Sequence, residues 1–195
     1  YFMTKKHLNQ NAKYDQKFID TIEPSFIFDN KPINRLEIFE NNTSNIKKDK
    51  KERISTLRKK INSIENCNLK NNSKNLIMGD GNINSPIMLI GEAPGENEDI
   101  ECLTFCGDIG VLLNKMLLAI NILKKNIYTS YSINFRPPED RKPTSKEIKR
   151  YSIFLKEHIS IIDPKIIILF GSTAMESVIS SNERISNERG KWKEI

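Results

Sequence analysis

Three strand candidates alternate with amphipathic stretches in the second half of the chain. They cover residues 87–90, 127–133 and 166–170, and the first and last are continuous apolar runs closed by a glycine. Such runs are typical of strands buried on both faces of a parallel sheet. The order strand, helix, strand therefore predicts an α/β fold, a three-layer α/β/α sandwich with a short central parallel sheet.

Apolar residues elsewhere recur at every third or fourth position, which is the period of one helix face. Helices are expected at 50–64, at 112–120 and at 148–162, the last opened by a capping box of Thr144 and Glu147, and a short one follows Gly171 through about Ile179. The three stripes are Ile54, Leu57, Ile61 and Ile64; Leu112, Leu113, Met116, Leu117 and Ile120; and Ile148, Tyr151, Leu155, Ile159 and Ile162.

Length and composition indicate one domain preceded by an arm. The 195 residues suffice for one α/β core, so we expect a loosely ordered arm at 1–50 and the domain at 51–195. The net charge of +6 suits a polyanionic partner such as nucleic acid, although abundant lysine also fits plain solvated surface. Three cysteines and no long apolar run argue against a disulfide scaffold and a membrane protein. We expect a cytoplasmic monomer.

The loops after the three strands carry the residues with chemistry. Ligands of parallel sheets bind outside the carboxyl ends of the strands. The first loop reads Gly-Glu-Ala-Pro-Gly at 91–95, and two carboxylates, Glu92 and Glu98, are close together in sequence. Glycine and proline favour a rigid backbone whose accessible amides can bind carbonyl oxygens or an anion. The plain alternative is an ordinary turn.

A longer pattern surrounds this loop. It comprises residues 91–99, Phe105, Gly107, Gly110 and Leu112-Leu113, then Arg136-Pro137-Pro138, Arg141, Pro143, Glu147-Ile148, Phe154-Leu155, Pro164, Gly171 and Arg189-Gly190. The pattern resembles the family 4 uracil-DNA glycosylases over roughly residues 67–192. The resemblance implies a base-excision repair hydrolase that flips uracil, a deaminated base, out of DNA and hydrolyses its N-glycosidic bond. The implied partner is DNA containing uracil.

The resemblance also implies roles for single residues. Phe105 matches the position that stacks an aromatic ring on uracil. Glu92 and Glu98 match acidic positions and are expected to be catalytic, with Glu92 nearer the chemistry, where a carboxylate orients water and stabilises the sugar cation. Glu96 is expected to face solvent. The cradle that stabilises the base oxygens, in the manner of an oxyanion hole, is implied for Gly91, Ala93, Pro94 and Gly95.

One substrate-binding position departs from the family. Family members carry an asparagine that reads the uracil edge, and Tyr131 matches that position. A tyrosine cannot copy the paired donor and acceptor of an amide, which affects base specificity. Asn134 or Ser132 are candidates to compensate, but a pleated strand sends Ser132 to the face opposite Tyr131.

The positions of the cysteine ligands also depart from the family pattern. Many family members bind a four-iron cluster through four cysteines. Cys67 matches one of them, whereas Lys70, Phe135 and Tyr151 occupy the other three positions. We expect no cluster and no other cofactor, as in a cluster-free bacterial subgroup in which aromatic side chains fill the space. Cys102 and Cys106 are not expected to bind metal.

The end of the sequence is the third departure. Family members continue into a fourth strand and a histidine motif that contacts uracil, whereas this sequence ends at Ile195. We therefore expect a C-terminally truncated domain whose last strand is missing, with weak or no activity. His7 and His158 are expected to be structural or surface residues.

Four basic or polar positions suit the DNA backbone. Arg136, Arg141 and Lys142 flank prolines in a rigid loop, and Ser172 lies where the amides of a helix N-terminus can hold a phosphate. Two other classes stay open. A catalytically impaired DNA-binding or damage-sensing relative would bind DNA without releasing a base. A nucleotide-binding protein on a doubly wound sheet is the second, although the chain has no phosphate-loop motif.

Overall fold

The structure, a computed structural model, describes residues 35–179 and 184–195. The chain divides into two units, 1–41 and 42–195, and the second contains the sheet. Residues 1–34 of the expected arm lie outside the described residues, as does His7. The helix expected at 50–64 begins earlier than predicted, since helix α2 spans Arg35–Asn62.

The sheet has four strands in the order β1-β3-β2-β4. Strand β2 (Ile87–Gly91) lies between β3 (Tyr128–Tyr131) and β4 (Ile166–Leu169) and is parallel to both, with Leu89 opposite Thr129 and Ile168. The parallel pairing predicted from the apolar runs is confirmed. The fourth strand, β1 (Asp80–Gly81), pairs antiparallel to β3, and this pairing was not predicted.

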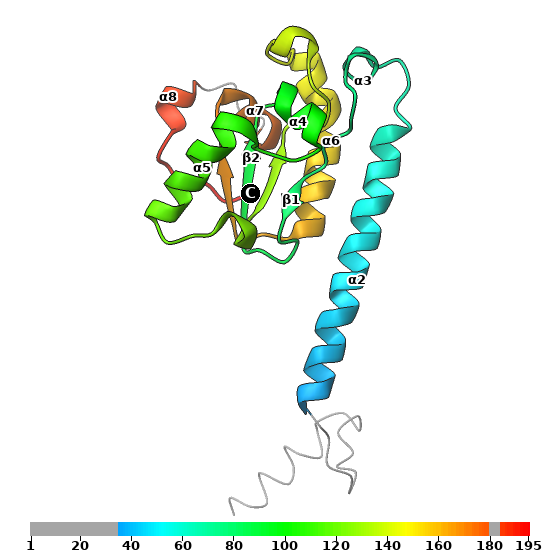
Figure 1. The fold of residues 1–195 in the computed structure, drawn as a ribbon, viewed down its shortest axis with the longest axis vertical. Helices are drawn as coiled ribbons and strands as arrows, with labels where there is room; N and C mark the ends of the chain where they lie inside the picture. Colours follow the sequence, from blue (N-terminus) through cyan, green and yellow to red (C-terminus); the bar gives the residue numbers. More distant parts are fainter. Residues whose placement is uncertain (1–34, 180–183) are drawn as a thin grey trace, which may run out of the picture. The chain divides into compact units, whose positions relative to one another are not determined.

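The helices match the predicted segments, and three short α-helices are added to them. Besides α2, the predicted helices are α5 (Gly107–Ala119), α6 (Ser145–Ile162) and α7 (Ser172–Ile179) (Figure 1). The added helices are α3 (Asn68–Asn72), α4 (Glu96–Glu101) and α8 (Ile185–Glu188). Two short 3-10 turns are η1 (Lys124–Asn126) and η2 (Pro138–Asp140). The capping box at α6 is confirmed, since the Glu147 carboxylate accepts from the Thr144 amide at 2.7 Å.

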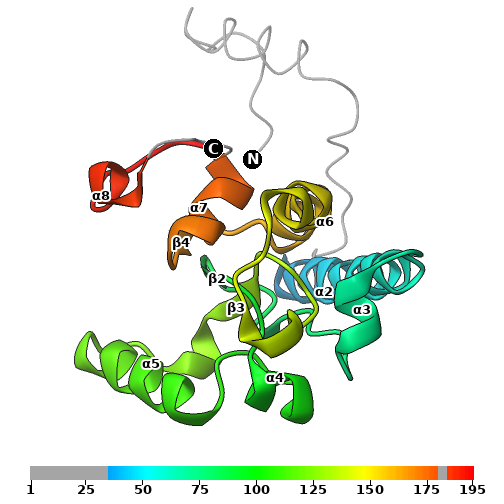
Figure 2. The same cartoon turned by 90° about the horizontal axis from the view of Figure 1, so that it is seen from above.

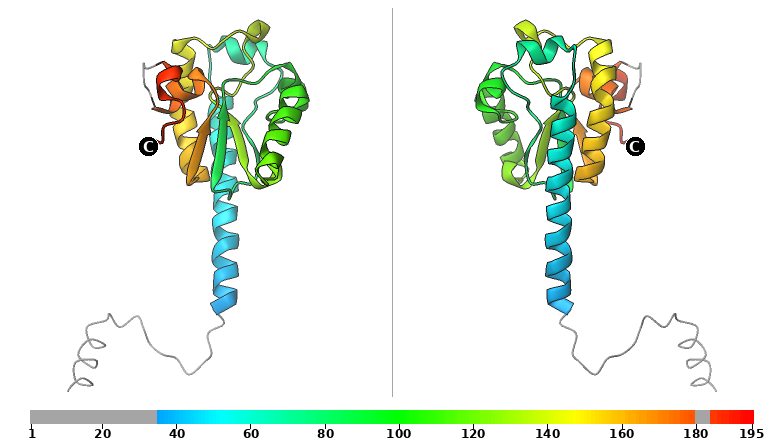
Figure 3. Two further views of the ribbon diagram at one scale, coloured as in Figure 1. Left: turned by 90° about the vertical axis from the view of Figure 1, so that its left-hand side faces the viewer. Right: turned by 90° about the vertical axis from the view of Figure 1, so that its right-hand side faces the viewer.

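Helices cover both faces of the sheet. Helices α4 and α5 lie on one side, and α6 lies with α7 and the second half of α2 on the other (Figures 2 and 3). The first side buries Leu89 against Leu113 and Leu117, and the second buries Met88 and Ile90 against Leu155. This arrangement confirms the three-layer α/β/α sandwich. Across 35–179 and 184–195, every helix is too short or too polar to cross a membrane.

The apolar stripe predicted at 112–120 is only partly buried, and the prediction was wrong for three of its five residues. Leu113 and Leu117 are buried, but Leu112, Met116 and Ile120 are more than half exposed. The segment is apolar on almost every side, so periodicity alone could not select the buried face. By contrast, on α6 Ile148, Tyr151, Leu155 and Ile162 are all buried.

His158 lies on α6 beneath the sheet and is 2% exposed. Its Nε2 lies 2.9 Å from the Tyr128 hydroxyl, and its Nδ1 lies 3.4 Å from the Ser130 hydroxyl. Burial lowers the pKa of His158 from its ordinary 6.5 to about 4. The expectation of a structural role agrees with these contacts, because a buried imidazole bonded to hydroxyls is held neutral.

The buried His158 makes folding stability depend on pH. Its folded pKa is lower than its unfolded pKa, so between pH 6.5 and 4 the unfolded chain binds a proton that the folded chain does not. We expect the free energy of unfolding to fall by roughly 3 kcal/mol as the pH drops through this window, and no further from this group below it. Urea unfolding at a series of pH values measures the change.

The matched control is the His158→Gln variant, which removes the titrating group. Its stability should be nearly constant between pH 6.5 and about 5, because paired carboxyls such as Glu147, whose pKa the hydrogen bonds from Arg141 lower to about 2, lose their contribution mainly below their ordinary value of 4.5. An equally steep decline in this variant would contradict the assignment.

Candidate active site

The loops after β2, β3 and β4 meet at one end of the sheet, as predicted, and enclose a pocket of about 260 Å³. We call it the strand-end pocket. Its lining residues are Gly91, Glu92, Ala93, Pro94, Gly95, Glu98, Phe105, Ile109, Tyr131, Pro137, Asp140, Arg141 and Phe170. A larger hollow of about 1030 Å³ lies between β4 and residues 185–195, but none of the predicted site residues lines it. The strand-end pocket is therefore the candidate site.

Glu92 is anchored from the third loop. The Thr173 hydroxyl, in the first turn of α7, donates to Glu92 Oε2 at 2.8 Å. The side chain of Glu92 therefore bridges the first loop and the first turn of α7. Within the described part of the chain no hydrogen bond reaches the other carboxylate oxygen, Oε1. Glu92 thus offers the pocket a fixed anion with one oxygen available.

Glu98 is placed differently. It is 5% exposed, and its two oxygens accept from the backbone amides of Gly95 and Cys106, both at 3.1 Å. Its carboxylate therefore ties the first loop to the start of α5, a positioning arrangement. Burial, followed by the charge of Glu98, raises the pKa of Cys106 to about 11, so that thiol stays protonated at neutral pH.

Aromatic rings form one wall of the pocket. The centroids of Phe105 and Tyr131 lie 5.0 Å apart, and Phe170 meets Phe105 edge to face at 6.0 Å. Gly91 lies against this wall, where a Cβ would stand 2.8 Å from the Tyr131 ring and 2.9 Å from that of Phe105. Only glycine fits such an approach without displacing the rings. Phe170 was not among the predicted site residues, although its place at the end of the third strand signals it.

The two residues considered as substitutes for an asparagine at position 131 face elsewhere. The Ser132 hydroxyl donates to the Gly91 carbonyl at 2.8 Å and accepts from Ser177. The side chain of Asn134 donates to the Ile77 carbonyl at 2.9 Å and is buried. Neither lines the strand-end pocket. Ser132 faces away from the pocket, as the strand pleat predicted, and Asn134 lies beyond the end of β3 with its amide bonded to Ile77, so neither is placed to compensate.

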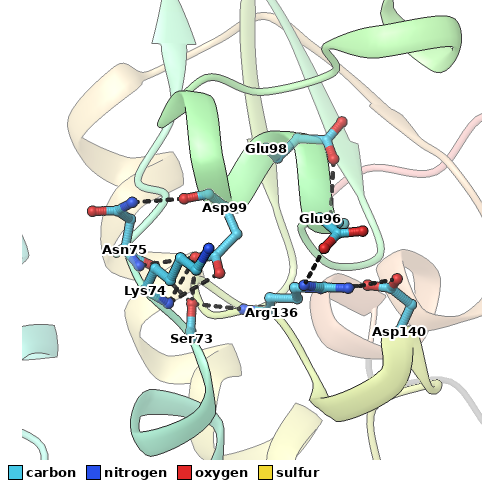
Figure 4. A network of polar contacts seen from close by, with 9 residues as sticks. Ser73, Lys74, Asn75, Glu96, Glu98, Asp99, Arg136 and Asp140 are labelled. Atoms are coloured by element: carbon cyan, nitrogen blue, oxygen red, sulfur yellow. Dashed lines mark hydrogen bonds and ion pairs between the residues drawn. The ribbon is translucent and has the colours of Figure 1, made fainter.

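Of the four predicted DNA contacts, Arg141 lines the strand-end pocket, and two, Arg136 and Arg141, are paired within the chain. Arg136 binds both oxygens of Asp140 at 2.7 and 3.0 Å and lies 3.6 Å from Glu96 (Figure 4). Arg141 binds the Glu147 carboxylate through two nitrogens, at 2.8 and 2.9 Å. The remaining two, Lys142 and Ser172, are exposed. Glu96 is exposed as expected, but it also pairs with Arg136.

Asp99 organises a polar network beside the pocket, and this role was not predicted. Its carboxylate accepts from the amides of Lys74 and Asn75 and from the Ser73 hydroxyl, at 2.7 to 3.1 Å (Figure 4). Burial alone would raise the pKa of Asp99, but the hydrogen bond from the Lys74 amide and the others lower it. Asp99 thereby fixes residues 73–75 against α4.

Three of the four positions matched to cluster cysteines gather in space. Cys67 Sγ lies 3.2 Å from the Tyr151 hydroxyl, the rings of Tyr151 and Phe135 meet at 6.3 Å, and all three residues are buried in one apolar cluster. Lys70 donates to the backbone carbonyls of Asn62 and Ile64. One thiol, two aromatic rings and an ammonium group do not fit a four-iron cluster, which takes thiolate ligands. Among the described residues, no group of three or more histidine, cysteine or acidic side chains could hold a metal ion.

Known proteins are similar in sequence to most of the second unit, residues 42–195. The family described as the uracil DNA glycosylase superfamily matches residues 78–194. The type-4 uracil-DNA glycosylase of Thermotoga maritima is 34% identical over 64% of this chain and 65% of its own length. The type-4 uracil-DNA glycosylase of Archaeoglobus fulgidus is 30% identical over 74% of this chain and 74% of its own length. That of Saccharolobus solfataricus is 36% identical over 68% of this chain and 63% of its own length. The chain thus spans 63% to 74% of these three relatives. It belongs to the uracil DNA glycosylase superfamily.

Proposed function

We propose that the protein removes uracil from DNA by hydrolysing the N-glycosidic bond, as the names of its type-4 relatives indicate for them. One observation carries the proposal. The strand-end pocket brings the Glu92 carboxylate, the backbone amides of Glu92 and Ala93 and the Phe105 ring together at the carboxyl ends of the strands. A flipped base that departs from a cationic sugar requires these groups.

The chemistry divides between the two sides of the pocket. As the bond breaks, the base becomes negative, and the backbone amides of Glu92 and Ala93 are proposed to stabilise its oxygens. Pro94 has no N–H, and the Gly95 amide donates to Glu98. The sugar becomes cationic, and the Glu92 carboxylate, held by Thr173, stabilises it and orients the attacking water. Phe105 stacks on the base. Glu98, with both oxygens bonded to backbone amides, keeps the loop in place.

DNA would approach over the rim of the pocket. Lys142 and Ser172 are exposed and are proposed to contact phosphates, with Arg136 and Arg141 releasing their carboxylate partners to do the same. The net charge of +6 favours association with a polyanion. The monomeric state and the cytoplasmic location stay predictions.

The test is release of uracil from an end-labelled single-stranded oligonucleotide with one uracil, followed by alkaline cleavage at the abasic site. The same oligonucleotide with thymine is the control. We expect strand cleavage only for uracil. Binding of both oligonucleotides without cleavage of either would instead support a DNA-binding module that lacks catalysis.

We also propose that the protein holds no iron-sulfur cluster. The buried contacts among Cys67, Phe135 and Tyr151 support this, because aromatic side chains occupy the positions of the ligands. We expect less than about one tenth of an iron atom per chain after anaerobic purification, since a cluster of this kind needs four thiolates. Iron and acid-labile sulfide analysis measures it, and about four irons per chain would refute the proposal.

A further inference from the structure

Phe105 has a backbone conformation that its side chain disfavours. Its φ is +49°, in the left-handed region that a residue with a Cβ rarely adopts. Such a residue persists only where its surroundings hold it, and these residues concentrate at binding and active sites. Phe105 lines the strand-end pocket, so what holds it also determines one wall of the site.

Two side chains from outside the loop hold the Phe105 backbone. The Tyr131 hydroxyl, on β3, accepts from the Phe105 amide at 2.9 Å. The Lys124 ammonium, on η1, donates to the carbonyls of Thr104 and Phe105 at 2.9 and 2.8 Å. Both peptide groups that flank Phe105 are therefore bonded to side chains that lie far from it in sequence.

Tyr131 is itself rigid. It is 4% exposed, and its ring packs on Gly91 from one side and on Phe105 from the other. Burial raises the pKa of its hydroxyl above the ordinary value, so the phenol is neutral and can both accept from Phe105 and donate elsewhere. Because the Tyr131 hydroxyl accepts from a main-chain amide, part of its effect on a base in the pocket is exerted through Phe105.

We infer that Tyr131 and Lys124 are positioning residues that clamp Phe105 in its left-handed conformation and so set the stacking ring of the pocket. The inference rests on the proposed function for the role of the ring, but the clamp is a property of the chain alone. It explains why a tyrosine serves at this end of β3: the phenol reaches across the pocket wall to the loop amide, which a shorter side chain would not do.

The first experiment measures the clamp without turnover. In the full chain labelled with ¹⁵N, hydrogen exchange of the Phe105 amide should be at least about tenfold faster in Tyr131→Phe than in the wild type, the factor expected for one lost hydrogen bond. The matched control is Tyr128→Phe, which removes another buried phenol oxygen, bonded to His158 instead. Unchanged Phe105 exchange in Tyr131→Phe, or the same acceleration in Tyr128→Phe, would overturn the inference.

The second experiment asks whether both residues act through Phe105. We expect Tyr131→Phe and Lys124→Met each to lower kcat/KM for uracil release about fivefold to tenfold, and Lys124→Arg to restore most of it. In a Phe105→Ala background, Tyr131→Phe and Lys124→Met should lower kcat/KM little further. Full additivity with Phe105→Ala would overturn the inference. A wild-type chain that releases no uracil would refute the proposed function alone, because the exchange measurement does not depend on turnover.

Discussion

We expect the Glu92→Gln variant to release uracil at least about a hundredfold more slowly than the wild type, the usual contribution of one well-placed acid-base group. Glutamine has the same length, and its carbonyl oxygen can still accept from Thr173. It carries no negative charge, however, so it neither stabilises a cationic sugar nor takes a proton from water. Single-turnover kinetics with enzyme in excess isolates this step from DNA binding.

Glu96→Gln is the matched control, because Glu96 lies in the same acidic segment but its side chain is 64% exposed. Its ion pair with Arg136 has a separation of 3.6 Å, and exposed pairs contribute at most about 1 kcal/mol. Uracil release should change less than about threefold. A Glu92→Gln variant that keeps more than a tenth of the wild-type rate, or a Glu96→Gln variant that loses as much as Glu92→Gln, would exclude Glu92 from the chemistry.

The location of the site followed from the sequence, but its internal bonding did not. Short apolar runs ending in glycine fixed where the strands stop, and parallel strands bring those ends together. The motif at 91–95 therefore identified Glu92 correctly as a pocket residue. Its anchor, Thr173, lies 81 positions further along the chain, and no local pattern connects the two. The same limit hid Asp99, whose partners are residues 73–75.

Periodicity failed where a helix is apolar all round. In α5 the spacing predicted the helix but assigned Leu112 and Met116 to the core, and both are exposed. Only the position of the sheet, a tertiary fact, selects Leu113 and Leu117. The conformation of Phe105 was not predicted for a related reason. The side chains that bond to its backbone, Tyr131 and Lys124, lie far from it in the sequence.

The Gly110→Ala variant should lose both stability and activity, although alanine is about 1 kcal/mol better than glycine inside a helix. Gly110 lies in α5, where an added Cβ would stand 2.7 Å from the Phe105 carbonyl carbon and closer still to its oxygen. These are backbone atoms, and the oxygen is also bonded to Lys124. Overpacking costs up to about 3 kcal/mol. We therefore expect a net loss of roughly 2 kcal/mol and, because Phe105 must move, at least a tenfold lower kcat/KM for uracil release, about the effect of 1.4 kcal/mol.

Asn114→Ala provides the comparison, because Asn114 is exposed on the same helix and its replacement meets no packed backbone. Helix propensity acts alone there, so the variant should be slightly more stable than the wild type and equally active. Urea unfolding and uracil release, measured on both variants, separate the two contributions. If Gly110→Ala proved as stable as Asn114→Ala, α5 could withdraw from the Phe105 carbonyl at little cost, and the tight contact between helix and loop would not be what fixes the stacking ring.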